Sequence, residues 1–203
     1  MRQFTDDDVG NLLELNGDPE VMRYLTGGAP TPREEIRDRL IPFHLSVYER
    51  FDGLGTWAAE SAAGEFLGWF HFRPGPGDDA ANIDLGYRLR RAHWGKGYAT
   101  EGSLALIEKG FTRLGARRVF AHAMAVNAAS RRVLEKCGLR LVRTAPYEGT
   151  WPVEGAEHGV AEYELTRAAW EALPAAGRLD SPGPAGRRTA APSAKAAGGS
   201  AAP

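Results

Sequence analysis

The middle of the chain joins an alternating strand, through a glycine turn, to a long amphipathic helix. In residues 82–89, apolar and polar side chains alternate, which is the two-residue period of a strand with one buried face. In residues 97–114, the apolar side chains instead recur every three or four positions, as in a helix with one buried stripe. The turn between the two segments contains Gly95 and Gly97. This strand–turn–helix unit predicts an α/β fold with at least one crossover connection.

The remaining segments extend this pattern over most of the chain. A hairpin signal at residues 62–65 separates the first two of five further runs rich in β-branched and aromatic residues. These runs predict strands at residues 55–61, 66–72, 119–126, 139–144 and 160–165. Asn127 is positioned to cap a helix that ends at Gly138. We therefore expect an α/β (α+β) fold built on a mixed sheet.

Helices are also expected before the first hairpin. Two short helices are predicted at residues 6–16 and 18–24. A longer helix is expected to begin at Thr31, which would act as the cap, with Pro32 in its first position and Glu34 completing a capping box. Pro42 is expected to kink or split that helix, because proline lacks the backbone N–H that a helix interior requires.

Composition divides the chain into a globular domain at 1–173 and a tail at 174–203. The whole chain has 203 residues, is 43% hydrophobic and 25% charged, and carries a net charge of −1. That balance is typical of a single globular domain and argues against an obligate nucleic-acid binder. Residues 174–203 are almost entirely Ala, Gly, Pro and Ser, so we expect this tail to be disordered.

Several other protein classes are excluded by simple counts. A single cysteine, Cys137, rules out a disulfide framework and a cysteine zinc site, and no His-x-x-x-His pair suggests a metal. No run approaches 18 apolar residues and the first residues lack the apolar core of a signal peptide. We therefore expect no metal and no membrane contact, and a cytoplasmic location.

The glycine turn is the best candidate for a ligand site. Two glycines allow the backbone to approach a ligand closely, and the following helix directs its first N–H groups at an anion. Lys96, Arg90 and Arg91 add positive charge beside the turn. A P-loop is excluded because Gly97 follows Lys96, and a dinucleotide fingerprint because Thr100 stands where its third glycine belongs.

This turn resembles the acetyl-coenzyme A loop of the GNAT N-acetyltransferases, in which Arg or Gln is followed by x, x, Gly, x and then Gly or Ala. Gly97 and Ala99 match the last two fixed places, and Trp94 stands at the first, as in the RimJ/RimL-type branch. Three other segments, at residues 18–24, 127–139 and 162–170, resemble that branch in the same order. Together these matches cover nearly all of residues 1–173.

The resemblance implies a fold, a co-substrate and a set of contacts. The expected fold is a GNAT-like, mostly antiparallel mixed sheet flanked by helices, with two central strands splayed apart. The co-substrate would be acetyl-CoA, with no metal. Backbone around Tyr87 and Leu89 would pair with the pantetheine arm, and Asn127 would hydrogen-bond the coenzyme. The pyrophosphate would lie on Trp94, Gly95, Lys96, Gly97, Tyr98, Ala99 and Thr100.

The resemblance is weaker where proton transfer is concerned. Many family members carry a tyrosine acid seven residues after the asparagine, and this chain has Leu134 there. In the RimJ/RimL-type branch the residue at Ser130 can lie near the thioester sulfur, so Ser130 is the expected hydrogen-bond donor to the thiolate. Asp84, on the strand that leads into the loop, is the first candidate for the general base. Glu60 and His71 on neighbouring strands are the alternatives.

The expected activity is direct transfer of an acetyl group from acetyl-CoA to a primary amine, either a protein N-terminus or a small molecule. The missing tyrosine motivates an alternative, a non-catalytic acyl-CoA-binding regulatory module. A nucleotide-phosphate enzyme that uses the same loop is the third hypothesis. The expected partner is the amine acceptor, with no nucleic acid and no membrane, and a homodimer is left open.

Overall fold

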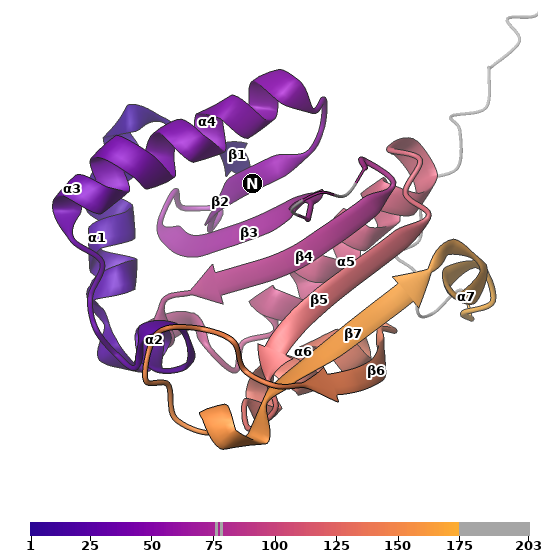
Figure 1. Cartoon of the computed structure of the whole chain (residues 1–203). Helices are drawn as coiled ribbons and strands as arrows, with labels where there is room; N and C mark the ends of the chain where they lie inside the picture. The colour runs from indigo at the N-terminus through magenta and orange to yellow at the C-terminus, as the bar shows by residue number, and fades with distance from the viewer. Residues whose placement is uncertain (76, 78, 175–203) are drawn as a thin grey trace, which may run out of the picture.

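The computed structural model describes residues 1–75, 77 and 79–174. The described residues form a seven-stranded sheet in the order β1-β2-β3-β4-β5-β7-β6 (Figure 1). Every neighbouring pair is antiparallel except β4 and β5. The strands are β1 (Arg2–Gln3), β2 (Gly55–Glu60), β3 (Phe66–Pro74), β4 (Asn82–Leu89), β5 (Arg118–Met124), β6 (Arg140–Ala145) and β7 (Val160–Thr166). The expected mixed, mostly antiparallel sheet is confirmed; the expected tail, apart from Pro174, lies outside the described residues.

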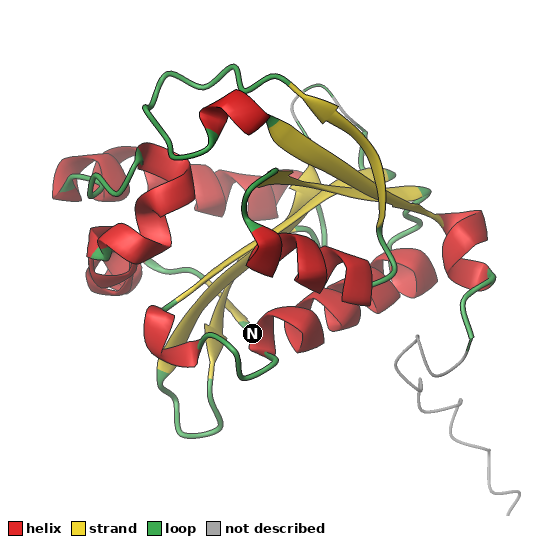
Figure 2. Cartoon of the chain, turned by 90° about the horizontal axis from the view of Figure 1, so that it is seen from below, coloured by secondary structure: helices red, strands yellow, loops and turns green. Residues whose placement is uncertain are grey.

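Helices cover both faces of the sheet (Figure 2). One face carries α1 (Val9–Gly17), α2 (Pro19–Thr26), α3 (Arg33–Glu35) and α4 (Ile41–Arg50), and the other carries α5 (Tyr98–Arg113) and α6 (Ala128–Lys136). Three short 3-10 helices are η1 (Asp6–Asp8), η3 (Arg91–His93) and η4 (Ala156–His158). A π turn, η2 (Ile36–Leu40), joins α3 to α4, and the last helix is α7 (Arg167–Glu171). Among the described residues, no helix is both long enough and apolar enough to cross a membrane.

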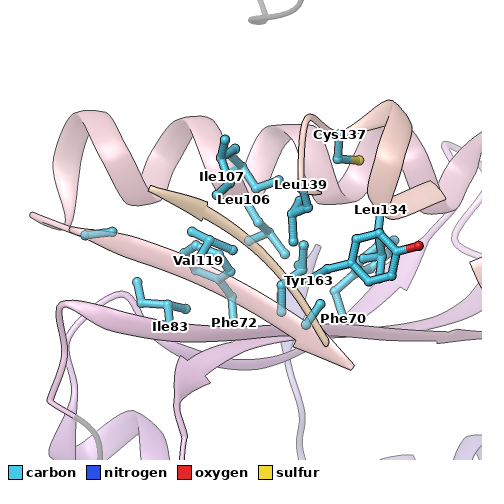
Figure 3. Close-up of a cluster of buried hydrophobic side chains, with 14 of the residues drawn as sticks. Phe70, Phe72, Ile83, Leu106, Ile107, Val119, Leu134, Cys137, Leu139 and Tyr163 are labelled. Atoms are coloured by element: carbon cyan, nitrogen blue, oxygen red, sulfur yellow. The ribbon is translucent and has the colours of Figure 1, made fainter. Parts of the chain in front are cut away.

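The strand alternation creates two hydrophobic clusters, one on each face. Phe70 and Phe72 of β3 point toward α5, within a cluster that also holds Cys137 (Figure 3). Trp69, which precedes Phe70 in sequence, packs on the opposite face against the cluster that contains Phe4 and Ile36. The sheet is therefore buried on both sides, which agrees with its apolar sequence.

The two central strands, β4 and β5, separate from each other along their length. They pair in parallel only at Asn82–Arg118, Ile83–Val119 and Asp84–Phe120, although both continue for several residues more. Figure 1 shows the two strands fanning apart toward α2. In the described part of the chain, no strand pairs with this side of β4 beyond Asp84. The expected splayed central strands are confirmed.

The helix predicted to start at Thr31 differs from the expectation. The cap position belongs to Pro32, and no side-chain cap is present among the residues described. A residue before proline is driven toward extended backbone, and Pro32 itself is extended with ψ of 148°, so the first helical residue is Arg33. The predicted capping by Thr31 is therefore wrong. At Pro42 the helix is not split: the π turn η2 leads directly into α4, and Leu40 and Ile41 both keep right-handed helical backbone. The π turn just before Pro42 is where the winding adjusts to the proline.

Candidate active site

The glycine turn between β4 and α5 leaves its backbone open to a ligand. Gly95 and Gly97 have φ values of +73° and +88°, which favour glycine, and a Cβ on either would meet no heavy atom within 4 Å in the described structure. Gly97 caps α5, whose first-turn N–H groups lack carbonyl partners within the helix. The indole nitrogen of Trp94 donates to the Leu89 carbonyl at 2.8 Å and fixes the turn. Such a turn can bind an anion.

A cavity of about 820 Å³ runs from this turn to the opening between β4 and β5. Of the residues predicted to bind the coenzyme, all but Lys96 line it, as far as the described residues show; so does Ser130, whereas Asp84 does not. The lining set is Tyr87, Leu89, Trp94, Gly95, Gly97, Tyr98, Ala99, Thr100, Asn127 and Ser130. These residues come from β4, the turn, α5 and the α6 N-terminus. The fold therefore assembles one continuous site from segments more than 40 positions apart.

The cavity passes through the sheet. Its wall includes Val21 and Tyr24 of α2 as well as residues of α5 and α6, which lie on the opposite face. A smaller cavity of about 150 Å³ adjoins it, shares Leu25 and Arg88 with it, and adds His71. The gap between the splayed strands is thus accessible from both faces, so two ligands can approach it from opposite sides.

The positive charges expected beside the turn are partly neutralised. Arg90 lies 2.6 Å from a Glu14 carboxylate oxygen, and Arg91 lies 3.5 Å from one of Asp18. Lys96 is exposed. The backbone N–H groups therefore carry more of the anion-binding capacity than the sequence suggests.

Ser130 and Tyr87 meet where the strands separate. The Ser130 hydroxyl oxygen lies 3.0 Å from the Tyr87 hydroxyl oxygen, and the Tyr87 hydroxyl also donates to the Ser130 carbonyl at 3.2 Å. Burial raises the pKa of Tyr87 to about 12, against the opposing effect of the Ser130 hydrogen bond, so the phenol stays protonated at neutral pH. The Oδ1 of Asn127 accepts the Ser130 backbone N–H at 3.1 Å and caps α6, as predicted. The two hydroxyl groups therefore line the same small cavity as Leu134, the position at which many family members carry the tyrosine.

Asp84 contacts His71, which lines the smaller cavity. Its Oδ2 lies 3.3 Å from the His71 Nε2, and it does not lie on either cavity wall among the described residues, whereas His71 does. Burial acts to raise the pKa of Asp84, but the His71 imidazole and the charges of Arg73 and His122 outweigh it and hold that pKa below its usual value. Asp84 is therefore an anion that can orient the His71 imidazole and stabilise its protonated form.

Gly86 makes this arrangement of His71 possible. It is the cross-strand partner of His71, and a Cβ at position 86 would lie 2.5 Å from the imidazole ring. The ring also stacks on Trp69, with centroids 5.6 Å apart. The imidazole is thus held between a neighbouring strand and an aromatic ring.

The other predicted candidates lie away from the gap. Glu60 pairs with Arg2 at 2.8 Å on β2 and, within the described residues, does not line either cavity. Among the cavity residues that sequence reasoning missed are Arg88 and His122. Both follow from strand alternation, which places Arg88 on the face of Asp84 and His122 on the matching face of β5. In the described chain, no group of three or more His, Cys, Asp or Glu side chains is arranged to hold a metal ion.

Comparison with known proteins identifies the family. The model of the acetyltransferase (GNAT) domain matches residues 1–140. The chain is 33% identical over 178 residues to the FsC-acetyl coenzyme A-N(2)-transacetylase of Aspergillus fumigatus, covering 83% of this chain and 71% of that one. It is 32% identical over 146 residues to the uncharacterised protein YkkB of Bacillus subtilis, covering 71% and 83% of the two chains.

Solved structures agree with this fold. The spermidine N-acetyltransferase of Vibrio cholerae in complex with CoA and spermine superposes with a TM-score of 0.67 at 16% identity, covering 84% of this chain and 96% of that one. The aminoglycoside acetyltransferase AAC(6')-Ib in complex with coenzyme A gives 0.65 at 20% identity, covering 84% and 95%. With the glycine turn, the splayed strands and the match of the domain model, the chain belongs to the GNAT acetyltransferase family and is an acetyl-CoA-dependent N-acetyltransferase.

Proposed function

We propose that the cavity through the sheet is the active site, with acetyl-CoA on the side of α5 and α6 and the amine on the side of α2. The observation that carries the proposal is the end of β4–β5 pairing at Asp84–Phe120, where the cavity opens to both faces. Acyl transfer needs the two reactants to meet in one place, and holding them there supplies much of the rate enhancement. A gap accessible from opposite faces meets that requirement.

The residues present fit the coenzyme. Its pyrophosphate would lie on the backbone of Gly95 and Gly97 and the first-turn N–H groups of α5, where the added Cβ atoms would meet open space. The pantetheine amides would pair with the free edge of β4 beyond Asp84, as an additional strand. Asn127 lines the same wall, although its Oδ1 is engaged in capping α6.

Two pairs of side chains act on the reacting groups: His71 with Asp84 on the amine, and Tyr87 with Ser130 on the thiolate. Bound acetyl-CoA supplies the acetyl group as a thioester, whose carbon–sulfur bond breaks as the amine nitrogen forms the new bond to the carbonyl carbon. His71 accepts the proton that the amine must lose, and Asp84 positions the imidazole and stabilises its protonated form. Tyr87 and Ser130 donate hydrogen bonds to the departing thiolate. Backbone N–H groups on the free edge of β4 stabilise negative charge on the carbonyl oxygen.

The acceptor is proposed to be a small-molecule primary amine. The smaller cavity, of about 150 Å³ and lined by Leu25 and His71 among others, suits a small amine better than a peptide chain. The relative from Aspergillus fumigatus is named for transfer to an N(2) nitrogen, which supports an amine acceptor for this chain as well. We further propose the RimJ/RimL-type branch, because of Trp94, and a cytoplasmic location. A homodimer would be compatible with this site. The alternative, a module that binds acyl-CoA without catalysing transfer, is separated from the enzyme by the two measurements that follow.

The first experiment measures the thermal midpoint with acetyl-CoA for the wild type, Gly97→Glu and Gly115→Glu. Both glycines have positive φ and open space at the Cβ position, so the two substitutions impose similar backbone strain, but only Gly97 lines the cavity in the described structure. At a hundredfold excess over the dissociation constant, the coenzyme should raise the wild-type midpoint by about 5 to 10 °C. The glutamate at position 97 repels the phosphates, so its shift should vanish, whereas Gly115→Glu should keep it.

A second measurement, amine-dependent release of the CoA thiol, separates the two functions. A midpoint shift together with turnover of a primary amine supports the proposal. A shift without turnover across a broad amine panel would favour the binding module. No shift in the folded wild type would overturn the assignment of the glycine turn to the coenzyme.

A further inference from the structure

Arg88 is a cation deep in the proposed acceptor side of the site, and no anion among the described residues is paired with it. Its side chain lines both cavities, and burial alone lowers its pKa to about 10. Among the ion pairs formed by the described residues, none includes Arg88, and its Nε is buried without a hydrogen-bond partner. An uncompensated charge that is withdrawn from water is costly to keep in a fold. A ligand that supplies the missing anion would remove that cost.

The guanidinium is held in one orientation by neutral groups. Its Nη1 donates to the side-chain carbonyl of Asn16, a residue that is only 1% exposed at the end of α1. Its plane lies over the Trp69 ring, with 5.0 Å from the guanidinium carbon to the ring centroid. Neither contact neutralises the charge. The side chain is therefore prepared for a planar oxygen ligand, such as a carboxylate, which Arg binds with two parallel hydrogen bonds.

The carboxylates on this side of the sheet are engaged with other cations. Asp84 lies against His71, and Glu162, which faces His122 from β7, pairs with Arg143. Glu14 pairs with Arg90, and Glu20, which lines the larger cavity with Arg88, lies 3.9 Å from Arg23. Among the described residues, none of these carboxylates forms an ion pair with Arg88, so the guanidinium is free to bind an anion of the ligand.

We infer that Arg88 binds a carboxylate of the acceptor, so that the substrate class is a primary amine that carries a carboxylate group, such as an amino acid. This inference rests on the proposed function, because it places the acceptor on the α2 side. Arg88 and His71 both line the smaller cavity, next to Gly86. A carboxylate on Arg88 would direct the amine of a short substrate toward the gap between the strands, where His71 can take its proton.

The test compares amines that differ only in a carboxylate. In each pair a methyl group replaces the carboxylate: glycine and ethylamine, β-alanine and propylamine, 4-aminobutanoate and butylamine, and L-leucine and 4-methylpentan-2-amine. In at least one pair, we expect the carboxylate to raise kcat/KM in the wild type by about ten- to a hundredfold, as for a hydrogen-bonded charge pair. Arg88→Met should abolish that preference and Arg88→Lys should retain part of it.

Arg90→Met is the matched control. It removes the same charge two residues away, from a side chain that lines neither cavity within the described residues, and it should keep the preference. Equal kcat/KM within every pair, or a preference that survives in Arg88→Met, overturns the inference.

A binding measurement keeps this test separate from the proposed function. The thermal midpoint of the CoA-loaded protein is recorded with butanoate and with butanol. If no amine turns over but butanoate stabilises the wild type and not Arg88→Met, the carboxylate site stands and the proposed activity fails. If neither turnover nor binding responds to a carboxylate, the inference about Arg88 is wrong.

Discussion

At the scale of single residues, the acceptor side of the site depends on side chains that each contact another segment of the chain. His71 lies over Gly86 and beside Asp84, and its neighbour Trp69 supports Arg88. The ring therefore has little freedom to turn, and the nitrogen that does not face Asp84 is the one left for the substrate. On this geometry we propose a positioning role for Asp84, whereas the sequence pointed to Asp84 itself as the base.

His71→Gln and Asp84→Asn should affect turnover differently. His71→Gln removes the proton acceptor and should lower kcat by about a hundred- to ten-thousandfold. Asp84→Asn keeps the imidazole but removes the negative charge that stabilises its protonated form, so the loss should be smaller. The acidic limb of the pH–rate profile should also shift to lower pH, which a purely structural defect would not produce.

His122→Gln is the control for this comparison. His122 also lines both cavities, but it is exposed and far less restricted than His71. Its substitution should change kcat only slightly. If His122→Gln lost as much activity as His71→Gln, or His71→Gln lost none, the assignment of the base would be wrong.

At the scale of the elements, the site depends on how closely α5 approaches the sheet. Gly102 and Gly110 lie on the buried face of α5, and a Cβ on them would lie 2.4 and 2.6 Å from the rings of Phe70 and Phe72. The helix therefore packs directly on β3, as Figure 3 indicates for the surrounding cluster. That close packing brings the α5 N-terminus to the end of β4, where the glycine turn connects them.

Gly102→Ala should destabilise the protein although alanine favours helix formation. The gain in helix propensity is about 1 kcal/mol, but a methyl group pressed against a buried aromatic ring costs about 1 to 3 kcal/mol. We expect a net loss of about 1 kcal/mol in the free energy of unfolding, measured by urea denaturation. Gly10→Ala in α1, where a Cβ would meet nothing within 4 Å in the described structure, should be neutral or slightly stabilising. Equal effects of both substitutions would contradict this account of α5 packing.

At the scale of the whole molecule, two hydrophobic clusters on opposite faces hold the sheet, and the gap between β4 and β5 opens between them. The cluster beneath α4 includes Phe4, on whose ring His44 stacks with centroids 5.3 Å apart. Burial, followed by the charges of Arg73, His71 and Arg88, lowers the pKa of His44 to about 4. The stability of the folded chain is therefore coupled to pH.

The free energy of unfolding should fall on acidification. Because the folded pKa of His44 is about 4 and the ordinary value is 6.5, the unfolded chain binds more protons between these values, and stability decreases as pH falls through this window. For His44 alone, the decrease is about 2 kcal/mol between pH 7 and pH 5. His44→Phe should remove that part of the decline, as measured by urea denaturation at each pH. His158→Phe, on an exposed loop, should keep it.

Much of the fold follows from local patterns in the sequence. The alternation in residues 82–89 and the helical period that follows correspond closely to β4 and α5, because side-chain periodicity and burial are properties of neighbouring residues. The glycine turn follows in the same way, since positive φ at Gly95 and Gly97 is a demand on single residues. The Thr31 cap was mispredicted because Pro32 overrides its local signal.

Contacts between distant segments were decided only by the tertiary structure. Tyr87 and Ser130 are 43 positions apart, and Asn16 and Arg88 are 72 apart; both pairs meet only once the strands separate and α1 packs on the sheet. Sequence periodicity gives the face of a strand on which a side chain lies, but not the partner that faces it. Sheet register paired His71 with Gly86, and the packing around that pair placed Asp84 on His71 and left Arg88 without an anion. The sequence therefore determined the fold and the glycine turn, whereas the proposed acceptor side of the site was decided by packing between segments far apart in the chain.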